Sequence, residues 1–175
     1  MTSNNRTVVV TGASGFVGRH VVRRLLDAGG FRVRCLMRNP GLISEMEEYG
    51  SAISFSEGDI TESKSLARAF EGAWGVVNLA GYREFWSANR RRFYDVNEQG
   101  AINVYQACIS AHVSKVVQVS TPLAWGVPRQ IPFDEETLPG AHPSDYARSK
   151  FKGDEAGWRL HEQQGLPLTV VYLAA

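Results

Sequence analysis

The sequence is poor in the features that tie a protein to an oxidising compartment, a membrane or a polyanion. It has 2 cysteines and a formal net charge of +1, and no apolar run approaches the length of a membrane span. Cys35 lies in an apolar strand pattern and Cys108 in a helical one, so both are expected as buried thiols. The N-terminal residues lack the apolar centre of a secretion signal. We therefore expect a cytoplasmic protein that binds neither nucleic acid nor membranes.

A metal site is not expected either. The histidines His112, His142 and His161 have no cysteine or acidic companions at ligand spacing. The rest of the composition is ordinary for a globular protein, with 175 residues, 43% hydrophobic and 21% charged. This length predicts one domain that buries a sizeable core.

One glycine-rich stretch stands out near the N-terminus. A β-branched run, Val8–Thr11, leads directly into the pattern Gly12-x-x-Gly15-x-x-Gly18 and then into an amphipathic helical pattern. Gly12 permits a tight turn, Gly15 lets a phosphate approach the backbone, and Gly18 lets the helix pack closely. Because the helix N-terminus presents free N–H groups, the stretch predicts binding of a dinucleotide pyrophosphate.

Strand and helix patterns alternate along the chain. This alternation predicts an α/β protein with a Rossmann-type, doubly wound parallel sheet in three layers, with strand order 3-2-1-4-5-6. A long loop over residues 121–143 carries five of the seven prolines, and loops of that length are usually functional. Strands are expected at residues 7–11, 31–37, 52–55, 75–79, 115–120 and 168–173, and helices at 15–28, 41–46, 63–70, 90–112 and 144–164.

The end of the second predicted strand bears on the choice of cofactor. Proteins that bind NAD usually place an acid there to accept a hydrogen bond from the ribose 2′-hydroxyl. This sequence has Arg38 instead and no acid nearby. A guanidinium suits a 2′-phosphate, with Arg19 and Ser14 as possible helpers, so NADP(H) is favoured and NAD(H) stays open. The alternative is that Arg38 is a solvated residue at a strand end.

A second pattern carries chemistry. Tyr146 and Lys150 are four residues apart in a helical pattern, which places both side chains on one helix face. A phenol is a poor base at neutral pH, and a nearby ammonium favours the phenolate and so eases proton exchange. The alternative is a solvated helix face. The pair follows a strand that ends in Ser120-Thr121, and ligands bind at such carboxyl ends of parallel strands.

Together these residues resemble the extended branch of the short-chain dehydrogenase/reductase superfamily, the NAD-dependent epimerase/dehydratase family. Around residues 33–40 the chain looks more like the NADPH-using, dihydroflavonol-reductase-like group than the epimerases. The matching segments are 11–18, 58–60, 78–81, 96–97 with Gly100 and Asn103, 119–121, and Tyr146 with Lys150.

The resemblance implies roles for individual residues. Tyr146 would be the general acid/base, Lys150 would bind the nicotinamide ribose, and Thr121 would hydrogen-bond the substrate oxygen. Asn97 is a catalytic candidate or, equally, a polar residue of helix packing. The implied cofactor-binding residues include an adenine contact at Asp59 and Ile60 and a ribose–phosphate contact at Ala80 and Gly81; the full set is Gly12, Ser14, Gly15, Phe16, Val17, Gly18, Arg38, Asp59, Ile60, Ala80, Gly81, Ser120 and Lys150.

The reaction that the resemblance implies is hydride transfer between a nicotinamide and a small-molecule carbonyl or secondary alcohol. Dehydratases of this branch carry an Asp-Glu pair after the catalytic Thr, whereas Pro122-Leu123 follows here. Two alternatives remain open, a nucleotide-sugar epimerase and a low-activity NAD(P)-binding sensor or interaction module. The run Arg90-Arg91-Arg92 is expected to be solvated, within pairing distance of Asp95 and Glu98; the alternative is that it binds an anionic substrate.

The chain is also shorter than the family. Extended members continue into a small C-terminal substrate domain, and this sequence stops after its sixth predicted strand. Residues 1–175 are therefore expected to form an NAD(P)-binding Rossmann domain without most of the substrate domain. Apolar surface left exposed in this way favours self-association, so a homodimer is possible.

Overall fold

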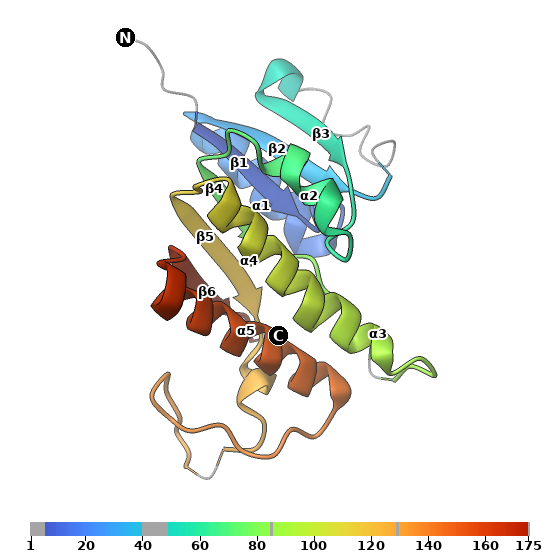
Figure 1. Cartoon of the computed structure of the whole chain (residues 1–175), viewed down its shortest axis with the longest axis vertical. Coiled ribbons are helices and arrows are strands. Elements are labelled where there is room, and N and C mark those ends of the chain that lie inside the picture. Colours follow the sequence, from blue (N-terminus) through green and yellow to red (C-terminus); the bar gives the residue numbers. More distant parts are fainter. Residues whose placement is uncertain (1–5, 40–48, 85, 129, 175) are drawn as a thin grey trace.

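The computed structural model describes residues 6–39, 49–84, 86–128 and 130–174. Its centre is a six-stranded parallel sheet with the order β3-β2-β1-β4-β5-β6, as predicted (Figure 1). The strand bounds agree with the predicted ones within two residues. The strands are β1 (Arg6–Thr11), β2 (Phe31–Met37), β3 (Ile53–Glu57), β4 (Gly75–Asn78), β5 (Lys115–Ser120) and β6 (Leu168–Tyr172).

The helices also follow the predicted pattern, with one difference. The single helix expected over residues 90–112 is interrupted by a π-helical turn, Asp95–Gln99, between α3 and α4. Such a turn inserts an extra residue into the helical repeat and is common at functional sites. The helix expected at 41–46 lies outside the described residues. The helices are α1 (Phe16–Ala28), α2 (Ser63–Phe70), α3 (Arg91–Tyr94), α4 (Gly100–Ser110) and α5 (Asp145–Gln164).

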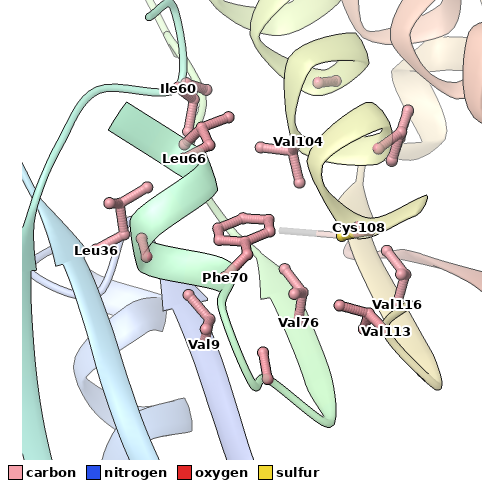
Figure 2. Close-up of a cluster of buried hydrophobic side chains, with 14 of the residues drawn as sticks. Val9, Leu36, Ile60, Leu66, Phe70, Val76, Val104, Cys108, Val113 and Val116 are labelled. Atoms are coloured by element: carbon pink, nitrogen blue, oxygen red, sulfur yellow. The ribbon is translucent and has the colours of Figure 1, made fainter. Parts of the chain in front are cut away.

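The helices form layers on both sides of the sheet. In Figure 1, α2, α4 and α5 lie on the viewer's side, and α1 lies behind β1 and β2. The larger apolar cluster fills the space between α2, α4 and the sheet, where the Phe70 ring points toward Cys108 and Val76 (Figure 2). Phe70 and Val104 are fully buried there, which accounts for the apolar stripes on both helices.

A smaller cluster lies between α1 and the opposite face of the sheet. It contains Val22 of α1, Val10 of β1 and Val33 of β2, all fully buried. The two clusters fix β1 at the middle of the sheet. The chain order reverses on either side of β1, so the carboxyl ends of β1 and β4 border the crevice in which sheets of this kind bind ligands. Among the helices of the described segments, none is long and apolar enough to cross a membrane.

Candidate active site

The glycine-rich turn closes against the end of β4. Gly12 has a φ of +65°, and a Cβ there would lie 2.8 Å from the backbone nitrogen of Ala80. A Cβ on Gly18 would lie 2.2 Å from the Gly12 carbonyl oxygen, because the first turn of α1 packs directly on the turn that precedes it. Both positions therefore exclude a side chain. Gly15 precedes α1 with no side-chain cap, so the N–H groups of that helix end remain directed outward.

These segments border a groove of about 290 Å³ at the ends of β1, β2 and β4. It combines the free N-terminus of α1 with backbone from the turns after β1 and β4, an arrangement that suits a pyrophosphate. Eight of the sequence-predicted cofactor residues line it, namely Gly12, Ser14, Gly15, Arg38, Asp59, Ile60, Ala80 and Gly81. Thr11, Leu36, Met37, Gly58, Leu79, Tyr82, Arg92 and Val96 complete the lining.

Five of the predicted cofactor residues lie outside this lining, Lys150 among them, and so do the other catalytic candidates. Phe16 is 83% exposed and packs edge-on against His20, with ring centroids 5.1 Å apart. Val17 is 39% exposed, and Gly18 is buried beneath the turn. Ser120 is buried, and its hydroxyl donates a hydrogen bond to the Asp154 carboxylate in the interior.

A buried polar chain underlies the groove. The hydroxyl of Thr11 donates to Asn78 Oδ1, and Asn78 Nδ2 donates to Gln118 Oε1 over 2.7 Å. Thr11 Oγ1 also accepts from the backbone nitrogens of Leu79 and Ala80, each at 3.2 Å. Three adjacent strands are thus joined at their carboxyl ends by side chains with nearly complete burial. In the sequence, this set of hydrogen bonds is signalled by one polar residue inside each of three otherwise apolar strands.

Arg92 is a groove residue that the sequence reasoning missed. Its guanidinium lies 4.6 Å from the centroid of the Tyr82 ring, and Arg92 is one of the residues that line the groove. The other two arginines of the run remain at the surface: Arg91 pairs with Asp95 at 3.4 Å, and Arg90 reaches across to Asp145. Glu98 pairs with a lysine of α5 instead of the arginine run.

Helix α5 carries the Tyr-x-x-x-Lys pair. It begins after Ser144, whose hydroxyl accepts a hydrogen bond from the backbone nitrogen of Ala147 at 3.1 Å. Lys150 is 6% exposed, and its Nζ donates to the carbonyl oxygen of Val119 at the end of β5 over 2.8 Å. Burial lowers the pKa of Lys150. Desolvation raises the pKa of the half-buried Tyr146.

Asn97 connects three parts of the site from within the π-helical turn. Its Oδ1 accepts from the backbone nitrogen of Tyr82 at 2.7 Å, and its Nδ2 donates to the Tyr82 carbonyl oxygen at 3.0 Å. The same Nδ2 donates to Ser149 Oγ over 3.0 Å. Asn97 therefore ties the segment after β4 to α5, between Tyr146 and Lys150.

Thr121 follows β5 and begins a short 3₁₀ helix, Pro122–Trp125. Its Oγ1 accepts from the backbone nitrogen of Leu123 at 3.4 Å, which leaves its proton available to another acceptor. The long segment that follows is anchored at both ends. Trp125 Nε1 donates to the Thr137 carbonyl oxygen at 2.9 Å, and the His142 ring is 2.8 Å from the Ala124 carbonyl oxygen.

The parallel sheet, the glycine-rich turn and the groove at the ends of β1 and β4 define a Rossmann-type domain of the kind that binds dinucleotides. The sequence profile of the NAD dependent epimerase/dehydratase family matches residues 8–174. The chain belongs to this family, as its motifs predicted.

Curated relatives cover several activities. The chain is 32% identical over 171 residues to sterol demethylase protein B of Methylococcus capsulatus, an alignment that covers 97% of this chain and 51% of the relative. It is 28% identical over 162 residues to a UDP-glucose 4-epimerase of Caenorhabditis elegans, covering 82% of this chain and 46% of that one. The chain thus spans about half the length of the curated relatives it matches.

Solved structures agree with the fold. The dTDP-glucose 4,6-dehydratase of Streptomyces venezuelae, solved with NAD bound, is 28% identical and superimposes with a TM-score of 0.84. That superposition covers 94% of this chain and 54% of the other. The family and fold of the chain are therefore established.

Proposed function

We propose that this chain is an NADP(H)-dependent oxidoreductase, or the cofactor-binding catalytic half of one, acting on a small carbonyl or secondary alcohol. The observation that carries the proposal is the joint placement of three groups. Tyr146 and Lys150 lie one turn apart on α5, Lys150 is bound to the end of β5, and Thr121 follows that same strand end. The groove for the dinucleotide lies at the same edge of the sheet.

In the proposed reaction, each side chain of the site has a separate role. Bound nicotinamide supplies or takes up the hydride. The Tyr146 hydroxyl gives a proton to the substrate oxygen in reduction and takes it back in oxidation. Thr121 donates a hydrogen bond to that oxygen and so orients it. Burial raises the pKa of Tyr146, and the positive charge of Arg83 opposes this rise and so favours the phenolate.

The preference for NADP(H) rests on the adenosine end of the groove. A hollow of about 660 Å³ adjoins it and shares Arg38, Gly58 and Asp59 with it. Lys64 and Arg68 of α2 also line this hollow, as do Glu57 and Glu62. Arg38, Lys64 and Arg68 are the bases in it that could bind a ribose 2′-phosphate. Oδ1 of Asp59 accepts hydrogen bonds from the backbone nitrogen and the hydroxyl of Thr61, each at 2.9 Å.

The variant Arg38→Ala tests this preference. Loss of a charge-assisted contact lowers NADPH affinity by about 10- to 100-fold and leaves NADH affinity unchanged. Arg32→Ala is the matched control, because Arg32 is an exposed arginine of β2, the strand that Arg38 follows. Equal effects of Arg38→Ala on the two cofactors contradict the role of this residue.

The catalytic role is tested by NADPH oxidation with a panel of aldehydes and ketones. Tyr146→Phe removes the proton donor, and general acid catalysis of this kind contributes about 10²- to 10⁴-fold. Tyr49→Phe is the control, because Tyr49 hydrogen-bonds Asp27 far from α5. Turnover that survives in Tyr146→Phe at the control level contradicts the proposal. Cofactor binding without turnover on any carbonyl favours a sensor or interaction module instead.

A second candidate is epimerisation of a nucleotide sugar. The similarity to a UDP-glucose 4-epimerase favours it. Incubation with UDP-glucose and a nicotinamide cofactor distinguishes the two functions, because an epimerase forms a sugar epimer without net change in the cofactor's absorbance. A reductase instead consumes NADPH in proportion to product.

A further inference from the structure

A carboxylate is buried one helical turn beyond Lys150. Asp154 is 4% exposed and faces the same side of α5 as Tyr146 and Lys150. One of its oxygens accepts the hydrogen bond of Ser120, and the other, Oδ1, has no hydrogen-bond partner among the described residues. A buried carboxylate with a free oxygen is costly and calls for an explanation. Neither the proposed proton transfer nor the cofactor groove uses it directly.

The contacts of Lys150 and Asp154 form a matched pair. Lys150 donates to the carbonyl oxygen of Val119, and Asp154 accepts from the hydroxyl of Ser120, the next residue of β5. Two ionisable side chains of α5 therefore hold two consecutive residues at the end of one strand. Thr121 is the residue that follows, so its position depends on this double attachment.

Few charged or titratable groups act on Asp154. Lys150 on α5 lowers the pKa of Asp154, while desolvation is stronger and raises it to about 6. Burial raises the pKa of Tyr105 on α4 and of Tyr172 on β6, and the negative charge of Asp154 raises each further. In return, the negative charge of Asp154 opposes the lowering of the pKa of Lys150 that burial causes.

We propose that Asp154 is a positioning residue of the reaction centre. Its buried negative charge acts as a counter-ion of Lys150 without a direct ion pair and favours the charged ammonium. Through Ser120 it holds the end of β5 from which Thr121 reaches the substrate. This role rests on the proposed oxidoreductase function. Tyr146 feels the same charge, since Asp154 raises its pKa and Arg83 lowers it.

The variant Asp154→Asn tests the proposal, because it keeps the shape and the hydrogen bond of Ser120 and removes the charge. We expect kcat for carbonyl reduction to fall at least tenfold, with KM and NADPH affinity within twofold of the parent. The pKa values of both Lys150 and Tyr146 fall in the variant, so the alkaline limb of the rate profile moves to lower pH. Glu155→Gln is the matched control, an equal charge change on an exposed neighbour of the same helix.

Two further variants test the proposal even if Asp154→Asn does not fold. Asp154→Glu restores the charge, and we expect it to recover most of the lost rate and the parental pH profile. Ser120→Ala keeps the charge and removes the hydrogen bond, so we expect a lower kcat with an unmoved alkaline limb. A parental kcat and pH profile in Asp154→Asn, or a shift equal to that of Glu155→Gln, overturns the proposal.

A readout without turnover separates this proposal from the proposed function. The ¹⁵Nζ resonance of Lys150 follows its titration in the full chain, with or without activity. We expect Asp154→Asn to lower the pH at which Lys150 titrates, and Glu155→Gln to leave it unchanged. An inactive parent protein contradicts the oxidoreductase, whereas an unshifted Lys150 in Asp154→Asn contradicts the counter-ion.

Discussion

Asn97 gives the sharpest stability prediction, because three hydrogen bonds meet on one amide. Its side chain accepts from the Tyr82 nitrogen at 2.7 Å and donates to the Tyr82 oxygen and Ser149 hydroxyl, each at 3.0 Å. Asn97→Ala leaves both backbone groups of Tyr82 without this partner. Each buried polar group left unpaired costs about 1–3 kcal/mol. Since Tyr82 is partly accessible, we take the lower part of that range and expect a loss of about 2–4 kcal/mol.

Urea unfolding of the parent, Asn97→Ala, Ser149→Ala and the double variant measures this loss. Ser149→Ala removes one partner and leaves the Tyr82 clamp intact, so we expect it to cost about 1 kcal/mol. The double variant should cost less than the sum, by about 0.5 kcal/mol or more, because the two share a hydrogen bond. A loss in Asn97→Ala no larger than that in Ser149→Ala refutes the reasoning, and Asn97 would then be replaceable in holding the segment after β4.

Three further predictions follow from the same geometry. Gly12→Ala places a Cβ 2.8 Å from the Ala80 nitrogen at a φ of +65°, so we expect it to lower the free energy of unfolding in urea by about 3 kcal/mol. The control Gly29→Ala has a φ of +70° with nothing within 4 Å and should cost about 1 kcal/mol, so equal costs contradict the close approach at Gly12. Arg92→Ala should lower NADPH and NADH affinity alike in a fluorescence titration, by about tenfold, since the pyrophosphate is common to both; an effect on NADPH alone contradicts that placement. The pKa of Asp154 rises from 3.8 to about 6 on folding, so its contribution to stability is present at low pH and is lost as the pH rises through 6. The parent protein should therefore lose about 1–3 kcal/mol of unfolding free energy between pH 4 and 7, and Asp154→Asn should abolish this loss. The same dependence of unfolding free energy on pH in parent and variant argues against the burial of this charge.

The sheet could be predicted because its signals are local. Each strand is a short β-branched run bounded by turns, and the predicted bounds of β5, for example, are those observed. The glycine-rich turn could be predicted as well, since at Gly12 and Gly18 nearby backbone atoms leave no room for a side chain. These features depend on neighbours within a few residues.

The parts that escaped prediction depend on distant contacts. Asp154 reads in the sequence as one more charge on a polar helix, and its burial follows only from the packing of α5 against the end of β5. Arg92 looks like its two solvated neighbours, and its place in the groove follows from the stacking on Tyr82. The π-helical turn around Asn97 likewise has no periodic signal, because the hydrophobic pattern continues through it.

The most direct test of the central claim, a groove that holds a phosphorylated nicotinamide dinucleotide, is a calorimetric titration of the 175-residue chain with NADPH and, separately, with NADH. The proposed function predicts saturable binding of both, with NADPH at least about tenfold tighter because it assigns Arg38 to the 2′-phosphate. Equal or tighter binding of NADH contradicts the placement of Arg38 on that phosphate. Failure of a folded chain to bind either dinucleotide contradicts the cofactor groove itself.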